Sequence, residues 1–233
     1  MELNLQQFGG RGSSNPQGGG NGFEKKGATS LKDGSSTIDL SGSPLRFGKD
    51  DARIREKLRA GVEEFEEKYR GSAVEYGATF NENGYQHTET RGTKTSVKIS
   101  TLDYDMADTY SHIHPREEGI LGGTFSETDL SHFAKFHVKT CRAAAKEGTY
   151  SISKGKNFDS TGFGEFVKRE FGKVTSEAHK TATVLNRKIN TMQYETYSQG
   201  IKDINNKMLV GLHNVLISGQ KQFGYKYTLE RRK

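Results

Sequence analysis

Two histidines and an aspartate are spaced so that they could bind one metal ion. His112 and His114 lie two residues apart in the run TYSHIHP, and Asp129 follows in the run SETDLSHF. Side chains at positions i and i+2 of a strand point to the same face, so both imidazoles could reach one ion. An aspartate in the first turn of the next helix could supply a third ligand and leave the fourth tetrahedral position to water. The spacing by itself therefore supports metal-assisted hydrolysis.

Ser126 precedes Asp129 by three residues, at the expected start of the same helix. Its hydroxyl could cap that helix, and from the helix start it could also donate a hydrogen bond to an oxyanion that develops beside the metal. A histidine pair of this spacing is a weak indication when it stands alone. The serine and the aspartate make the pattern more specific.

The complete pattern, H-x-H-P followed by ten residues and then S-x-x-D, resembles the signature of the JAMM (JAB/MPN) metallopeptidase superfamily. The resemblance implies that the two histidines and Asp129 hold zinc. The gap of ten residues is at the long end of what the family shows, and the segment GILGGTF would form an extra loop. The similarity extends over about residues 50–155 and does not account for the rest of the chain.

The family's remaining catalytic residue is a glutamate on the first strand after the opening helix, usually followed closely by a glycine. Glu75 has this setting, because the run SAVEYGATF follows Gly71, where the expected first helix ends. A carboxylate beside a zinc-activated water can take a proton from that water and return it to the leaving amine. The resemblance therefore implies that Glu75 is the general base and acid. An exposed strand carboxylate is the alternative, and Glu82 and Glu89 are rivals for the role.

The first half of the chain predicts one helix and several short strands. From Lys49 to Gly71, apolar residues recur three or four positions apart between charged ones, which is typical of an amphipathic helix. Alternating and β-branched residues separated by NENG or RG predict antiparallel strands joined by tight turns. These strands are expected in AVEYGATF, GYQHTETRG and TKTSVKIS, followed by another in TLDYDMADTYSHIHP that ends near His112.

The second half predicts helices and two further strands. A helix is expected from Ser126 to Gly148, with the spacing of a capping box at its start. The run TYSISKG predicts a strand, residues 162–220 predict helices broken near Gly172 and Gly200, and FGYKYTLERR predicts a closing strand. This order indicates an α+β domain with a mostly antiparallel mixed sheet flanked by helices. The resemblance implies the JAMM and cytidine-deaminase type of this fold.

The sequence divides into three parts. Residues 1–48 are rich in glycine and serine and nearly free of large apolar side chains, which is typical of a flexible, disordered tail. Residues 49–155 would form the JAMM-like zinc hydrolase core, and residues 156–233 would form a helical extension with the closing strand. The opening run MELNLQQFGGRGSS is similar to the N-termini of minor head proteins from phages and prophages of Gram-positive bacteria. Such a tail could fold on docking to a phage head or another large assembly.

Composition excludes several classes of protein. The formal net charge is +6, but 35 basic residues are mixed with 29 acidic ones, so a solvated surface explains the charge better than nucleic-acid binding. The single cysteine, Cys141, excludes an internal disulfide, a multi-cysteine zinc site and the PCxxC site of nucleic-acid deaminases. It lies in an alanine-rich run of the expected helix, where a buried thiol is expected. No apolar run approaches the ~20 residues that cross a bilayer, and the N-terminus lacks a signal-peptide pattern, so we expect a soluble protein of a reducing compartment.

The leading hypothesis is a zinc-dependent hydrolase that cleaves a peptide or isopeptide bond in a protein substrate. The resemblance supplies this substrate class. Two alternatives stay open at this point: a non-catalytic, head-associated structural protein that uses a JAMM-like scaffold, and a phage-delivered toxin or counter-defence effector. These settings place the protein in the bacterial host cytoplasm or in the phage virion.

Overall fold

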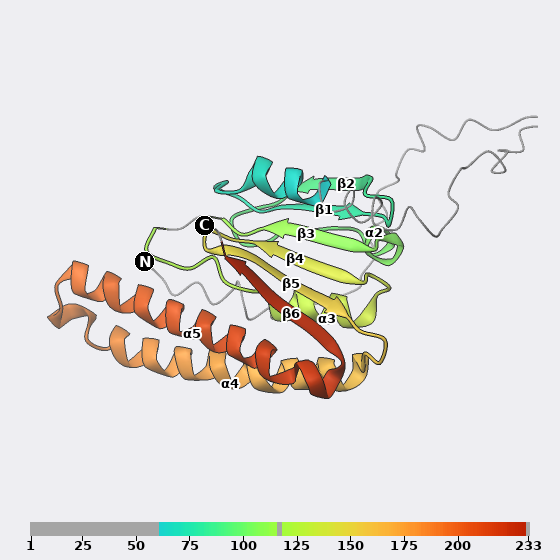
Figure 1. The fold of residues 1–233 in the computed structure, drawn as a ribbon. Coiled ribbons are helices and arrows are strands. Elements are labelled where there is room, and N and C mark those ends of the chain that lie inside the picture. The colour runs from blue at the N-terminus through green and yellow to red at the C-terminus, as the bar shows by residue number, and fades with distance from the viewer. Residues whose placement is uncertain (1–60, 116–117, 232–233) are drawn as a thin grey trace, which may run out of the picture.

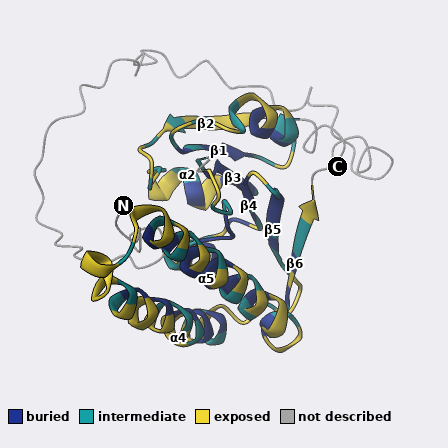
Figure 2. Cartoon of the chain, turned by 90° about the vertical axis from the view of Figure 1, so that its left-hand side faces the viewer, coloured by how far each residue is buried: buried dark blue, intermediate teal, exposed yellow. Residues whose placement is uncertain are grey.

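A six-stranded mixed sheet is the centre of the fold, and helices cover both of its faces (Figures 1 and 2). The computed structural model describes residues 61–115 and 118–231, so the tail predicted over 1–48 and the first part of the helix predicted from Lys49 lie outside the described residues. The spatial order of the strands is β2-β1-β3-β4-β5-β6. Their bounds are β1 Tyr76–Phe80, β2 Gln86–Arg91, β3 Thr109–Ile113, β4 Thr140–Ala144, β5 Gly148–Lys154 and β6 Tyr225–Arg231.

Four of the five strand pairings are antiparallel, and β3 with β4 is the parallel one. This confirms the predicted α+β class with a mostly antiparallel sheet. It also confirms the strands predicted in AVEYGATF, GYQHTETRG, TYSISKG and FGYKYTLERR, and the strand in TLDYDMADTYSHIHP, which forms β3 and ends at Ile113. A parallel pair needs a crossover, and the connection from β3 to β4 contains a helix. The helices are α2 Thr101–Met106, α3 Glu127–Lys135, α4 Ser160–Asn186, the short η3 Ile189–Thr191 and α5 Tyr194–Phe223, together with the helical residues 61–69.

Successive residues of β3 point to opposite faces of the sheet, so this strand joins two separate cores. On one face, Ile113 belongs to the apolar cluster that packs against helical residues 61–69. On the other face, Tyr110 belongs to a larger cluster formed with α3, α4, α5 and the neighbouring strands. Every residue of β3 is buried, as the dark central strands in Figure 2 show. His112 is two residues from Tyr110 and therefore lies on the face of the larger cluster.

A buried carboxylate ties helical residues 61–69 to the sheet. Glu66 is 1% exposed and accepts hydrogen bonds from Ser111 of β3 at 2.9 Å and from Thr149 of β5 at 3.1 Å. The guanidinium of Arg142 on β4 donates to the same carboxylate at 2.7 and 3.1 Å. Burying a charge costs free energy unless it is paired and hydrogen-bonded, and here three strands supply the partners. The network holds β3 from the face opposite His112.

The helices α4 and α5 form a hairpin that packs along one face of the sheet (Figure 1). The helix breaks predicted near Gly172 and Gly200 are wrong, because both helices run through these glycines and the chain turns at 187–193. A Cβ atom at Gly200 would lie 2.8 Å from Leu185 of α4, so this glycine allows the two helices to approach closely. That close packing offsets the roughly 1 kcal/mol that glycine costs inside a helix.

The helix predicted from Ser126 to Gly148 is wrong in its second half. α3 ends at Lys135, and the alanine-rich run that carries Cys141 forms β4 instead. The position of this run between β3 and β5 overrides the helical propensity of alanine, since small side chains fit a strand that is covered on both faces. Cys141 is fully buried on β4, so its predicted burial is confirmed and its predicted helix is not.

The strand predicted in TKTSVKIS does not form, although this segment is fully described. A tight turn begins at Thr93, whose amide donates to the carbonyl of Ser96 at 2.7 Å and whose hydroxyl accepts from the amide of Ser96 at 3.2 Å. The turn redirects the chain, so that Val97 packs against β1 at Gly77. A Cβ atom at Gly77 would lie 3.1 Å from the Val97 side chain, and the glycine therefore makes room for this contact.

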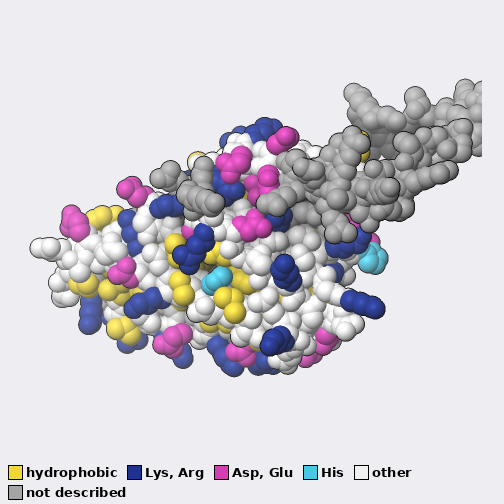
Figure 3. Space-filling view, in the orientation of Figure 1, with side chains coloured by type: hydrophobic (Ala, Val, Ile, Leu, Met, Phe, Trp, Pro, Cys, Tyr) yellow, Lys and Arg dark blue, Asp and Glu magenta, His cyan; other side chains and the backbone are white. Residues whose placement is uncertain are grey.

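The surface of the described part carries charges of both signs. Figure 3 shows lysine and arginine side chains interspersed with aspartate and glutamate over the face turned to the viewer. No helix within residues 61–115 and 118–231 has the length and apolar character needed to cross a membrane.

The buried network of Glu66 predicts a large loss of stability on substitution. Replacing Glu66 with Gln removes the charge that binds the half-buried guanidinium of Arg142 and leaves only Glu230, at 3.7 Å, as its acidic partner. The free energy of unfolding should therefore fall by about 2 kcal/mol. Urea denaturation measures this loss. Glu64→Gln, an exposed position on the same helix, is the matched control and should change stability by less than about 0.5 kcal/mol. Equal effects of the two substitutions would contradict the assigned role of Glu66.

Candidate metal centre

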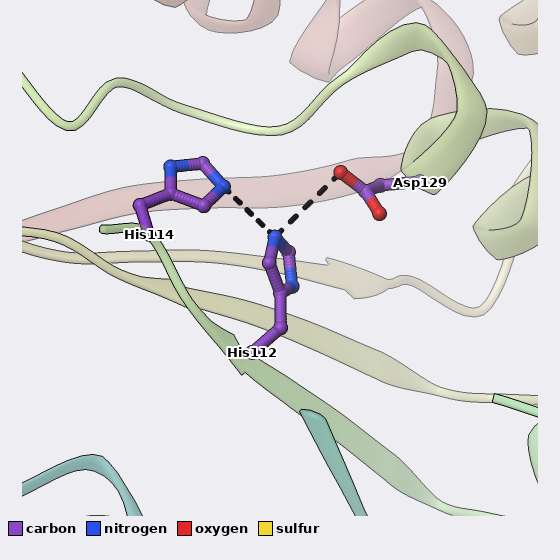
Figure 4. Close-up of side chains that lie close together, drawn as sticks. All are labelled: His112, His114 and Asp129. Atoms are coloured by element: carbon purple, nitrogen blue, oxygen red, sulfur yellow. Dashed lines mark hydrogen bonds and ion pairs between the residues drawn. The ribbon is translucent and has the colours of Figure 1, made fainter. Parts of the chain in front are cut away.

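His112, His114 and Asp129 converge at the end of β3, and we refer to them as the ligand triad (Figure 4). The Nε2 atoms of the two imidazoles lie 2.9 Å apart, and Nε2 of His112 lies 3.6 Å from Oδ2 of Asp129. One potential ligand atom from each residue lies within 4.8 Å of the other two. The spacing of the histidines gives both rings the same face of the sheet, and α3 brings the carboxylate to that face.

Two of the three separations within the ligand triad are close to those of a tetrahedral cation site, and the third is at most 4.8 Å. Ligand atoms at about 2.0–2.1 Å from zinc lie about 3.3–3.4 Å apart in tetrahedral geometry. The distances of 2.9 and 3.6 Å between ligand atoms bracket this value. Two imidazole nitrogens and one carboxylate oxygen are a donor set that zinc accepts, and three protein ligands leave a position for solvent or substrate. The residues thus fit the Zn2+ that the sequence predicts.

Burial sets protonation states that suit metal binding. His112 is 2% exposed, and burial lowers its pKa to about 4 against the opposing charge of Asp129. Burial by itself would raise the pKa of Asp129, but the charge of His112 and the hydrogen bonds from Ser126 outweigh it and hold this pKa below its ordinary value. At neutral pH the site therefore offers a neutral imidazole and an ionised carboxylate, which are the forms that coordinate a metal ion.

Ser126 caps α3 and also orients Asp129. Its hydroxyl accepts from the amide of Asp129 at 3.1 Å, and its own amide donates to Oδ2 of Asp129 at 2.9 Å, which confirms the predicted capping box. The hydroxyl also donates to the same Oδ2 atom at 2.7 Å. The hydroxyl proton of Ser126 is thus already donated to Asp129. To stabilise an oxyanion as predicted, the hydroxyl would have to give up this hydrogen bond and donate to the substrate oxygen instead.

The loop that follows β3 fixes the proton on His114. Nδ1 of His114 lies 2.7 Å from the carbonyl oxygen of Gly122 and 3.1 Å from that of Gly123. Carbonyl oxygens can only accept, so Nδ1 must carry the ring proton. In the neutral ring, Nε2 then keeps its lone pair, which points toward the other members of the ligand triad.

Glu147, in the hairpin between β4 and β5, holds the same loop. Its carboxylate accepts from the amide of Gly122 at 3.0 Å and from the amide of Gly123 at 2.8 Å. The hydroxyl of Tyr150 donates to this carboxylate at 2.7 Å. Burial would raise the pKa of Glu147, but these hydrogen bonds outweigh it and hold the pKa below its ordinary value.

The C-terminal helix α5 holds the start of the loop. Asn206 accepts from the amide of Leu121 at 2.8 Å and donates to the carbonyl of Gly119 at 3.0 Å. Gly123 has a φ of 79°, and a Cβ atom there would lie 2.5 Å from Leu209 of α5. Sequence reasoning missed Glu147 and Asn206, because their partners are backbone groups that leave no spacing pattern. The glycines of GILGGTF were the available signal.

Glu75 lies directly before β1, where backbone hydrogen bonds with Gly92 and Thr93 continue the pairing of the strand, and it is on the face that carries the histidines. Gly77 pairs with His112 across β1 and β3, and residues 75 and 77 share a face. Glu75 is 7% exposed, and burial together with the charge of Asp129 raises its pKa to about 8, against a hydrogen bond from the backbone of Val97. Glu75 is thus electrostatically coupled to Asp129, but it is not one of the three converging ligand groups.

The rival glutamates lie elsewhere. Glu89 pairs with Ala78 in the register of β1 and β2, and Ala78 belongs to the apolar cluster on the face opposite the histidines. The carboxylate of Glu89 accepts a hydrogen bond from Tyr69 on that face. Glu82 lies in the turn between β1 and β2, at the other end of β1 from Glu75. The geometry therefore favours Glu75.

The chain matches no known protein-family model, and no curated protein or solved structure matches it significantly. The likeness to the JAMM signature therefore stays a resemblance of motif. A functional assignment depends on the residues of the site and on their geometry.

The raised pKa of Glu75 predicts how the stability of the metal-free protein, kept so by a chelator, changes with pH. The pKa is raised from 4.5 to about 8, so the folded state holds the proton more tightly than the unfolded state. The resulting stability is fully present below about pH 4.5 and is lost as the pH rises through about 8. Between these values the free energy of unfolding should fall by a few kcal/mol relative to Glu75→Gln. The free energy of unfolding is measured by urea denaturation at each pH. If it depended on pH in the same way in the wild type and in Glu75→Gln, Glu75 would not be a buried, protonated carboxyl.

Proposed function

We propose that this chain is a zinc-dependent hydrolase of the JAMM type that cleaves a peptide or isopeptide bond in a protein substrate. The ligand triad would hold the ion, and Glu75 would act as general base and acid. The observation that carries the proposal is the convergence of two imidazole nitrogens and one carboxylate oxygen at distances suited to zinc. The resemblance of the H-x-H-P and S-x-x-D motifs supports the choice of an amide substrate.

Zinc would supply Lewis acidity, which lowers the pKa of a coordinated water to about 7 and polarises the substrate carbonyl. Glu75 would accept a proton from the attacking water and later transfer it to the nitrogen of the leaving amine. Its pKa of about 8 describes the site without a cation. A nearby positive charge favours the ionised carboxylate, which is the form that a general base needs.

Ser126 would contribute to both the ground state and the transition state. In the structure its amide and its hydroxyl both donate to Oδ2 of Asp129, which fixes the orientation of this ligand. If the hydroxyl turns toward the substrate, the amide hydrogen bond is retained and Asp129 stays in place. The freed hydroxyl would then donate to the oxyanion that forms on the substrate carbonyl.

The setting we propose is a phage or prophage protein that acts in the bacterial host cytoplasm or in the virion. The resemblance of MELNLQQFGGRGSS to minor head proteins supports this setting. Residues 1–48 would then bring the hydrolase to a large assembly.

Metal analysis of the purified protein tests the proposed site. The wild type, loaded with zinc and desalted, should retain about one zinc per chain, whereas His114→Ala and Asp129→Ala should retain almost none. Saturating zinc should also stabilise the wild type by about 2.7 kcal/mol when free zinc is 100 times the dissociation constant. His137→Ala is the matched control, because this exposed histidine pairs with Asp105 on the surface. A wild type without zinc, or a control that loses zinc equally, would contradict the proposed site.

Glu75→Gln separates chemistry from metal binding. The variant keeps the size of the side chain but cannot accept the proton, so turnover should fall at least about 100-fold while zinc content stays near one per chain. Suitable assays are cleavage of a proteome-derived peptide library and of a lysine isopeptide-linked model substrate, with products identified by mass spectrometry. Glu89→Gln, on the opposite face, is the control and should keep full turnover. Full activity in the Glu75 variant would refute the proposed base.

A further inference from the structure

We propose that Glu147 is a positioning residue of the metal centre that fixes the ring of His114 through the backbone of Gly122 and Gly123. This inference rests on the proposed zinc site. The hydrogen bonds of the Glu147 carboxylate go to Gly122, Gly123 and Tyr150, and not to the ligand triad. Glu147 acts on His114 through the peptide group between Gly122 and Gly123.

The contacts form an unbroken chain from the carboxylate to the ligand. Nδ1–H of His114 donates to the carbonyl of Gly122 at 2.7 Å. That carbonyl belongs to the same peptide group as the amide of Gly123, which donates to Oε1 of Glu147 at 2.8 Å. The preceding amide, of Gly122, donates to Oε2 of Glu147 at 3.0 Å. One carboxylate therefore fixes two consecutive amides, and the peptide group that contains the second amide accepts the hydrogen bond of His114 through its carbonyl oxygen.

These hydrogen bonds have an electrostatic effect on His114 in addition to orienting its ring. A carboxylate that accepts from the N–H end of a peptide group polarises that group, so its carbonyl oxygen becomes a stronger acceptor. Histidine ligands of metals commonly donate their second ring nitrogen to a carboxylate or a backbone carbonyl, which orients the ring and makes the coordinating nitrogen more basic. Here the two kinds of partner act one behind the other: the carbonyl of Gly122 binds His114, and the carboxylate of Glu147 binds the other end of the same peptide group.

The backbone at Gly122 and Gly123 is held in one conformation by close packing. A Cβ atom at Gly122 would lie 2.5 Å from the Cβ of Ala145, so the loop lies directly against the β4–β5 hairpin that carries Glu147. Gly123 has a φ of 79°, a backbone conformation that favours glycine. Tyr150 donates to Oε1 of Glu147 at 2.7 Å and holds the carboxylate toward the loop. The geometry of this contact is thus determined from the hairpin, the loop and β5 together.

Glu147→Gln tests the inference with little change in shape. The glutamine offers one acceptor oxygen, and its NH2 group faces an amide N–H that it cannot bind. Zinc affinity, measured by competition with a chromophoric chelator, should fall about 10- to 100-fold. Glu118→Gln is the matched control, because it makes the same substitution at an exposed position of the same loop. Its zinc affinity should stay within about threefold of the wild type.

A second readout is independent of metal. Imidazole nitrogen shifts in NMR spectra of the wild type with chelator should show His114 with its proton on Nδ1, and Glu147→Gln should shift His114 toward a mixture of the two tautomers. Unchanged zinc affinity and an unchanged tautomer in Glu147→Gln would overturn the proposal, as would equal losses of affinity in Glu147→Gln and Glu118→Gln. If the wild type binds no zinc but the tautomer responds to Glu147→Gln, the positioning role is supported and the proposed zinc hydrolase fails.

Discussion

The alternation of side chains along β3 is the constraint on which the site depends. His112 and His114 face the same side of the sheet only while this strand keeps its register, and a shift by one residue would turn both rings to the other face. Two sets of contacts hold the register. Glu66 binds Ser111 of β3 from the opposite face, and Tyr110 is packed in the larger apolar cluster. The carboxylate of Asp129 then approaches from α3, whose start is fixed by the capping box of Ser126.

The contacts that hold the ligand triad in place come from elements spread over most of the described chain. β4 continues the pairing beyond β3, since the amide of His114 donates to the carbonyl of Ala144 at 2.9 Å. The β4–β5 hairpin supplies Glu147, and α5 supplies Asn206 to the loop between His114 and α3. The helix α5 is therefore connected by direct hydrogen bonds to the loop that follows β3, although the resemblance to JAMM proteins does not extend to this helix.

The local features of the site were predictable from the sequence. The contacts that hold the site from distant parts of the chain were not. The shared face of His112 and His114 follows from strand periodicity, and the capping box of Ser126 follows from the spacing of a serine and an acid, so both could be read from a few neighbouring residues. The α+β class and five of the six strands of the described sheet, β3 among them, were predictable for the same reason. The strand at Cys141 was not, because its alanines favour a helix until β3 and β5 enclose them. Glu147 was also not predictable, since its partners are the backbone amides of a loop 24 or 25 residues away.

In the proposed site, two imidazoles and one carboxylate of this chain bind one zinc ion and leave a position open. X-ray absorption at the zinc edge of the zinc-loaded protein measures this coordination. We expect a first shell of about four nitrogen and oxygen atoms at about 2.0–2.1 Å, with outer-shell scattering from two imidazole rings that falls to that of one ring in His114→Ala. A six-oxygen shell, a sulfur ligand, or a spectrum that His114→Ala leaves unchanged would contradict the proposed site.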